Sequence, residues 1–173
     1  MFATIYLPNF FLQAALRHQT GLEGKPVALI DDQAQKAAII QLNHAAEEAG
    51  IRLGMTPSQG LARDLSLIVK TRARAQEKFL DELLLHFGYT LTPYVEATAP
   101  GVCTVQFTDT KNALRNVTRV VEQLHDSNVI AQAGIAPTAD ASLLAAHLAQ
   151  PVLQIDDVQD FLAPLPIETL ALG

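Results

Sequence analysis

Cysteine is nearly absent from this sequence of 173 residues, which contains only Cys103. A single thiol cannot form an internal disulfide, and neither a CxxC motif nor a cluster of His and Cys offers a zinc site. Cys103 is therefore interpreted as a small core residue in a reducing cytosol. No apolar run approaches the roughly 18 residues needed to span a bilayer, and the start lacks the basic region of a signal peptide. These absences predict a cytoplasmic protein with no membrane partner.

Positive charge is also scarce, with 12 Lys and Arg against 18 Asp and Glu and a net charge of -6. This balance opposes non-specific affinity for a phosphate backbone, which is mainly electrostatic. No GxxxxGK[ST] or GxGxxG motif supports phosphate binding by a glycine-rich loop. What the sequence does have is 49% hydrophobic residues and no low-complexity run, which is typical of a compact domain. Any contact with DNA must therefore be local, or supplied by parts outside this sequence.

Apolar patterning predicts alternating strands and helices. The expected strands are 2–7, 26–30, 37–42, 90–96, 102–107 and 129–135, and the expected helices are 8–17, 43–49, 57–63, 74–87, 114–124 and 138–149. The strands 26–30 and 37–42 are expected to pair. Residues 97–101 are left to close a β-hairpin, and Thr56 is a plausible N-cap before Pro57.

The order of these elements predicts an α+β fold. When residues 19–70 are set aside, the order strand, helix, hairpin, helix, strand is close to the ferredoxin-like plan, an antiparallel or mixed sheet with helices on one face. Residues 19–70 are predicted to form a separate small lobe at one edge of that sheet. Because many unrelated proteins share this plan, the pattern alone does not indicate a chemistry.

Five short strings, in order along the chain, resemble Y-family (translesion) DNA polymerases. They are Asn-Phe-Phe at 9–11, Ala-Gly-Ile-Arg-Leu-Gly-Met at 49–55, Gly-Ile-Ala-Pro at 134–137, Leu-Ala-Gln-Pro at 148–151 and Phe-Leu-Ala-Pro-Leu-Pro at 161–166. The resemblance implies a polymerase palm built from 1–18 and 71–165, with fingers inserted at 19–70. Residues 166–173 would then begin a linker to a thumb that this sequence does not include.

Active Y-family polymerases hold two magnesium ions with clustered carboxylates, because Mg²⁺ is a hard cation that prefers oxygen ligands. The resemblance places the first-strand acids at Tyr6 and Pro8, and the adjacent hairpin acids at Pro100 and Gly101. None of these residues can hold magnesium. The sequence therefore predicts no metal site, no cofactor and no catalytic residue.

The positions that the family uses for the nucleotide are altered as well. Phe11 falls on the wall that faces the sugar, and is interpreted here, like Phe10, as a core residue. The triphosphate positions in the fingers fall on His44 and Glu47, and the palm lysine falls on Leu143, so cations are lost and an anion is gained. His44 is otherwise read as a solvated or capping residue. This pattern is similar to the catalytically inactive ImuB-like branch, which acts in bacterial mutagenic repair beside a separate polymerase.

The main hypothesis is a non-catalytic subunit of DNA repair or translesion synthesis. It would contact DNA through the full-length protein, with a repair polymerase, adaptor proteins and a sliding clamp as suspected partners. One alternative is an active, error-prone Y-family polymerase that uses the displaced acids Glu96 and Asp109 with Mg²⁺. Another is a ferredoxin-like regulatory binding domain unrelated to DNA.

One basic stretch offers a candidate DNA contact. It comprises Lys70, Arg72, Arg74 and Lys78, and the competing interpretation is a solvated helix start. The acidic pair at 31–32 is read as a turn between two strands and not as a metal site, because Asp is a common turn residue.

Overall fold

The structure is a computed structural model that describes residues 1–166. The chain divides into two compact units, a lobe of Asn9–Leu80 and a larger unit made of Met1–Pro8 and the chain from Asp81 onward. Helix α4 (Arg74–Leu91) contributes residues to both. Of the linker predicted at 166–173, residues 167–173 lie outside the described residues. Within residues 1–166, every helix is too short or too polar to cross a membrane.

The larger unit is built on a five-stranded sheet in the order β5-β6-β1-β7-β8. Its other elements are β1 (Phe2–Tyr6), β5 (Val95–Ala99), β6 (Val102–Gln106), α5 (Ala113–Asp126), β7 (Gln132–Ala136), α6 (Ala139–Leu148), β8 (Val152–Gln154) and α7 (Val158–Leu162). β1 pairs antiparallel with β6 and β7, whereas β8 is parallel to β7. The predicted α+β class and mixed sheet are confirmed, while β8 and α7 lie outside the predicted elements.

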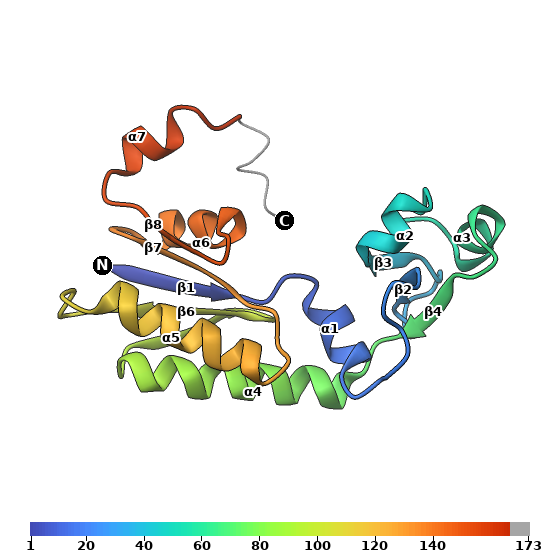
Figure 1. Cartoon of the computed structure of the whole chain (residues 1–173), viewed down its shortest axis with the longest axis horizontal. Coiled ribbons are helices and arrows are strands. Elements are labelled where there is room, and N and C mark those ends of the chain that lie inside the picture. Colours follow the sequence, from blue (N-terminus) through green and yellow to red (C-terminus); the bar gives the residue numbers. More distant parts are fainter. Residues whose placement is uncertain (167–173) are drawn as a thin grey trace. The chain divides into compact units, whose positions relative to one another are not determined.

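Helices cover both faces of this sheet (Figure 1). α4 and α5 lie on one face, as the ferredoxin-like plan predicts, and α6 adds a layer on the other. A Cβ on Gly88 of α4 would lie 2.8 Å from the sulfur of Cys103, so α4 packs directly on β6. Burial raises the pKa of Cys103 to about 12, which keeps the thiol protonated and agrees with its interpretation as a core residue.

Helix α6 approaches β7 so closely that only glycine fits between them. A Cβ on Gly134 would lie 2.2 Å from the carbonyl oxygen of Ser142 and 2.3 Å from the nitrogen of Ala146. Both neighbours are backbone atoms of α6, which cannot move without displacing the helix. Gly134 therefore sets the spacing between sheet and helix.

A chain of hydroxyl groups crosses the interface between the sheet and α6. Thr98 donates to Thr104 at 2.8 Å, the hydroxyl of Thr104 lies 3.1 Å from that of Thr4, and Thr4 lies 2.7 Å from the hydroxyl of Ser142. Ser142 donates in turn to the carbonyl of Ala139 at 2.7 Å. Because each buried hydroxyl has a partner, the polar groups do not weaken the core. Their hydrogen bonds also favour a single position of α6 on the sheet.

The hairpin differs from the prediction. Helix α4 continues to Leu91, with the Thr90 hydroxyl bonded to the carbonyl of Phe87 at 2.6 Å, and β5 begins only at Val95. The predicted strand 90–96 is therefore wrong at its start, because helical contacts overrode the β-branched composition. The connection shortens from the predicted five residues to Pro100–Gly101, where Gly101 supplies a positive φ of 72°.

The lobe contains a three-stranded sheet in the order β3-β2-β4. Its elements are α1 (Phe10–Leu16), β2 (Val27–Ile30), β3 (Ile39–Leu42), α2 (His44–Glu48), α3 (Pro57–Arg63) and β4 (Ile68–Thr71). The predicted pairing of β2 with β3 is confirmed, and β4, which was not predicted, adds in parallel to β2. The Thr56 side chain caps α3 in a capping box with Gln59, as predicted.

The lobe extends beyond the predicted segment 19–70 because α1 belongs to its core. Leu12 and Ala15 of α1 pack against Val27 and Leu29 of β2. The backbone nitrogen of Leu12 donates to the side-chain oxygen of Gln41 in β3 at 2.8 Å. These contacts tie α1 to the lobe's sheet.

We expect Gly134→Ala to destabilise the protein by about 3 kcal/mol or more, because its Cβ would meet the backbone of α6. Gly88→Ala is the matched control and should cost about 1 kcal/mol, since its Cβ would meet mainly side-chain atoms that can shift. Urea denaturation followed by circular dichroism measures both. Equal losses for the two variants would contradict the spacing role of Gly134.

Candidate nucleotide site

Tyr6 ends β1, at the position where the resemblance places a first-strand carboxylate. Its ring packs on that of His147 in α6, with centroids 4.0 Å apart. Burial raises the pKa of Tyr6 and lowers the pKa of His147, so both side chains are neutral near pH 7. A neutral phenol does not supply the anionic oxygen that Mg²⁺ prefers.

The end of β1 lies against the hairpin turn. The backbone nitrogen of Leu7 donates to the carbonyl of Gly101 at 2.9 Å. The structure therefore places Tyr6 and Pro8 at the same end of the sheet as Pro100 and Gly101. Proline and glycine have no side-chain oxygen, so this end of the sheet lacks ligands at all four positions.

One acid near the turn was missed by the sequence analysis. Oδ1 of Asp81, in α4, accepts a hydrogen bond from the nitrogen of Gly101 at 2.8 Å. In the sequence Asp81 is one of several acids on the polar side of an amphipathic helix, so no pattern distinguishes it. Within residues 1–166, no group of three or more His, Cys, Asp or Glu side chains could hold a metal ion.

The two displaced acids lie on different strands or loops of the larger unit. Asp109 follows β6 at the end where Phe107 bonds to Met1, opposite to the end that holds Tyr6. At ~3.4 Å per residue, the strand separates these ends by roughly 15 Å. Glu96 is exposed on the edge strand β5. An ion held by carboxylates at 2.0–2.1 Å, typical of Mg²⁺, therefore cannot join Asp109 to the end of the sheet that holds Tyr6.

The positions expected to contact the triphosphate hold no lysine or arginine. His44 is exposed on α2, 3.3 Å from Glu48 and 3.8 Å from Glu47. The side chain that caps α2 is Asn43, which accepts from the nitrogen of Ala46 at 3.1 Å, so the capping role considered for His44 is wrong. Glu47 and Glu48 together give α2 a negative character.

Leu143, at the position of the palm lysine, lies in α6. It is partly buried and lines an apolar hollow with Leu144, Val158 and Leu162. A leucine there serves packing, and it offers nothing to a phosphate oxygen.

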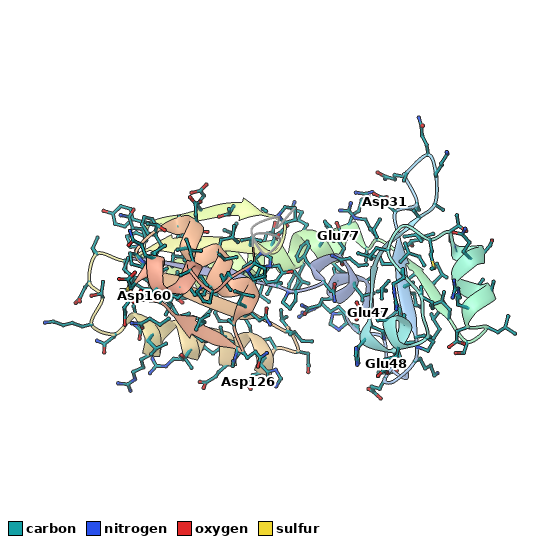
Figure 2. All side chains as sticks on the ribbon, turned by 90° about the horizontal axis from the view of Figure 1, so that it is seen from above. Asp31, Glu47, Glu48, Glu77, Asp126 and Asp160 are labelled. Atoms are coloured by element: carbon teal, nitrogen blue, oxygen red, sulfur yellow. The ribbon has the colours of Figure 1, made fainter. Side chains whose placement is uncertain are left out.

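Phe11, at the sugar-facing position, is covered by an arginine. The guanidinium of Arg72 stacks over the Phe11 ring at 4.0 Å from its centroid. Nε of Arg72 bonds to Glu77 at 2.9 Å and Nη1 bonds to Asp31 at 3.3 Å. The hydrogen bond that Arg72 donates to Glu77 raises the pKa of Arg72 above its ordinary value. Asp31 and Glu77 come from the turn after β2 and from α4, and Figure 2 labels both. We call Arg72, Asp31, Glu77 and Phe11 the arginine cluster.

The neighbouring residue Phe10 is buried, as expected for a core residue.

The basic stretch is therefore largely neutralised by acids. Arg74 bonds to Asp31 at 2.9 Å, and the side chain of Arg72 is only 18% exposed. Lys78 lies in α4, near the start of the helix. Lys70 lies in the strand β4, so the interpretation of the stretch as a solvated helix start does not apply to Lys70. The turn role of Asp31 is confirmed, because its Oδ1 accepts from the nitrogen of Gln33 at 3.0 Å, and that bond lowers the pKa of Asp31.

Arg17 is a cation that the sequence analysis did not single out. Its guanidinium lies 4.9 Å from the centre of the Phe79 ring, and its Nε is buried without a hydrogen-bond partner among residues 1–166. Phe79, in α4, is 47% exposed. No spacing rule joins a residue at the end of α1 to one in α4, so only the fold shows this pair.

The family of the chain follows from comparison with known proteins. A model described as IMS, the impB/mucB/samB family, matches residues 5–147. The chain belongs to the impB/mucB/samB family. This membership confirms the Y-family resemblance drawn from the short strings, and it argues against a regulatory domain unrelated to DNA.

Curated relatives of this impB/mucB/samB chain include two proteins named DNA polymerase IV. The one from Pseudomonas syringae pv. tomato is 26% identical over 172 residues, covering 93% of this chain and 48% of the relative. The one from Francisella tularensis subsp. novicida is 22% identical over 175 residues, covering 96% and 50%. The chain thus spans about half the length of these relatives.

Solved structures of Y-family polymerases share the fold. An insertion ternary complex of Dbh DNA polymerase superimposes with a TM-score of 0.85 at 17% identity, covering 99% of this chain and 54% of that one. DinB from Sulfolobus solfataricus gives a TM-score of 0.85 at 17% identity, covering 99% and 53%. The likeness therefore extends through both units of this family member.

We expect Arg72→Ala to destabilise the lobe by roughly 2–3 kcal/mol, because it leaves the buried carboxylate of Glu77 without its partner. Arg74→Ala is the control, since it removes a pair to the same Asp31 but from a side chain that is 43% exposed, and should cost about 1 kcal/mol or less. Chemical denaturation measures both. If Arg72→Ala costs no more than Arg74→Ala, the arginine cluster is not structural.

Proposed function

We propose that this chain is the palm and fingers of a non-catalytic Y-family polymerase-like protein that serves DNA repair or translesion synthesis. The larger unit corresponds to the palm and the lobe to the fingers. The proposal is supported by the residues at the end of β1 and at the hairpin turn. These are Tyr6, Pro8, Pro100 and Gly101, at the positions where two-metal nucleotide transfer requires carboxylates.

Losses at separate places support the same conclusion. The fingers positions carry His44 and Glu47, the palm position carries Leu143, and Phe11 lies under Arg72. A triphosphate would meet acids and an apolar side chain instead of cations. This combination favours a protein of the ImuB-like kind, working beside a separate catalytic polymerase.

The active alternative rests on the relatives named DNA polymerase IV. It requires acids other than the expected ones to bind magnesium. Asp109 follows β6 at the end opposite Tyr6, Glu96 is exposed on β5, and Asp81 already accepts a hydrogen bond from Gly101. A single half-buried carboxylate does not replace a cluster, so the non-catalytic hypothesis is preferred.

We expect no saturable binding of a deoxynucleoside triphosphate with Mg²⁺ to this chain. Isothermal titration calorimetry with each nucleotide, with and without magnesium, measures this directly. Full-length DNA polymerase IV from Pseudomonas syringae is the positive control. Magnesium-dependent binding in the micromolar range would mean that other acids hold the ions, and would sink the non-catalytic proposal.

The distribution of charge bears on DNA. The lobe, residues 9–80, holds nine Lys and Arg and seven Asp and Glu, a net charge of +2, whereas the larger unit holds three and eleven, a net charge of -8. Contact with phosphates is therefore more favourable on the lobe, where Arg17 has a guanidinium without a carboxylate partner among residues 1–166. DNA, a repair polymerase, adaptors and a sliding clamp would be reached through the full-length protein.

We expect weak, salt-sensitive binding of a primer-template duplex, with about one unit of salt slope for each phosphate contacted. Arg17→Ala should weaken it several-fold, because it removes a lobe cation that has no carboxylate partner among residues 1–166. Arg115→Ala, an exposed cation of the acidic larger unit, should leave the affinity nearly unchanged. Fluorescence anisotropy at two salt concentrations measures these affinities. Tight binding at physiological salt, or an equal effect of the two substitutions, would contradict this placement.

A further inference from the structure

A groove in the larger unit lies between the end of α5 and the starts of β7 and β8. It is lined by Val121, Glu122, His125, Asp126, Ile130, Ala131 and Pro151. Val121 and Ala131 form a buried apolar floor, whereas Ile130 is 61% exposed. The groove belongs to neither the hairpin turn nor the nucleotide positions.

Strand-like alternation places Ile130 in solvent. Val129 points into the core, 1% exposed, and its nitrogen bonds to the carbonyl of Leu124 at 2.9 Å. Ala131 points inward again, at 6% exposure, so Ile130 between them must face outward. A polar side chain would be hydrated at this exposed position. The isoleucine, which lies beside an apolar floor, instead offers a contact for another apolar side chain.

Two acids form the rim of the groove. Glu122 and Asp126 are exposed one turn apart on α5, and neither has a cation within ion-pair distance among residues 1–166. Like charges at this spacing repel, and Asp126 at the helix C-terminus also opposes the helix dipole. Asp126 lies at the periphery of the larger unit (Figure 2). The repulsion between the two acids and the position of Asp126 both destabilise the helix. A cation bound beside the acids would offset this electrostatic cost.

The charge of the whole unit selects the kind of partner. With a net charge of -8, the larger unit repels a phosphate backbone and attracts a cationic surface. Its three cations, Lys111, Arg115 and Arg119, precede Glu122 along the chain. Complementary charge thus excludes nucleic acid from this groove and favours a basic protein segment.

We propose that this groove is a docking site for a basic, amphipathic segment of a partner protein. An apolar side chain of the segment packs on Val121 and Ile130, and flanking Lys or Arg side chains pair with Glu122 and Asp126. This goes beyond the proposed function, and it holds whether or not the chain binds nucleotide.

Three labelled peptides of equal length test the site on the full 173-residue chain by fluorescence anisotropy. The first combines Lys with Leu at helical spacing, the second replaces Lys by Glu, and the third replaces Leu by Ser. We expect the Lys/Leu peptide to bind roughly tenfold or more tightly than either other peptide. Equal binding of the Lys/Ser peptide would show attraction to charge alone and would overturn the proposal.

Variants locate the binding. Glu122→Lys combined with Asp126→Lys should abolish the preference for the Lys/Leu peptide, and the exposed Ile130→Ser should weaken it about tenfold. Glu96→Lys combined with Asp109→Lys is the matched control, with the same change of charge on exposed sites outside the groove. Binding should survive in this control, and an equal loss in it would overturn the assignment.

Sedimentation of the chain alone tests the rival occupant. We expect a monomer whose sedimentation is the same in the Glu122→Lys, Asp126→Lys double variant. A dimer that the double variant dissociates would assign the groove to a second copy of this chain, and would overturn the proposal of a separate partner.

Discussion

β1 is hydrogen-bonded along its whole length to β6 on one side and to β7 on the other. This double pairing sets the register that places Tyr6 opposite Val102 and Gln132, and it brings the end of β1 to the hairpin turn. Both pairings are made by backbone groups. Replacement of side chains at this end of the sheet therefore leaves the frame of a polymerase palm intact.

The family frame is thus kept while the charges within it are rearranged. The end of β1 carries Tyr6, whose ring packs on His147. In the lobe, Arg72 bonds to two carboxylates and covers the ring of Phe11. A side chain that is hydrogen-bonded and mostly buried contributes to stability and is not available to a ligand. Under the function proposed above, the positions that face a nucleotide in the family serve packing and ion pairing in this chain.

The two units also differ in net charge. The lobe is weakly positive and the larger unit strongly negative, although the net charge of the whole chain hides the difference. Because electrostatic attraction decays over about 10 Å at moderate salt, each unit presents its own field to a partner. A nucleic acid and a basic protein would therefore be drawn to different surfaces of one chain.

The sequence by itself determined the family resemblance, and spacing from the short family strings is the basis on which Tyr6, Pro100 and Glu47 are proposed as site positions. It also determined the central strands, most helices and the Thr56 cap, because these follow from local periodicity and capping chemistry. Only the tertiary structure decided that Asp81 bonds to Gly101, 20 residues away, and that Arg72 bonds to Asp31, 41 residues away. It alone added β4 and β8 and left Ile130 exposed beside an acidic rim. Periodicity reports which way a side chain faces within its own element, whereas pairing across the fold depends on register and packing that no local pattern contains.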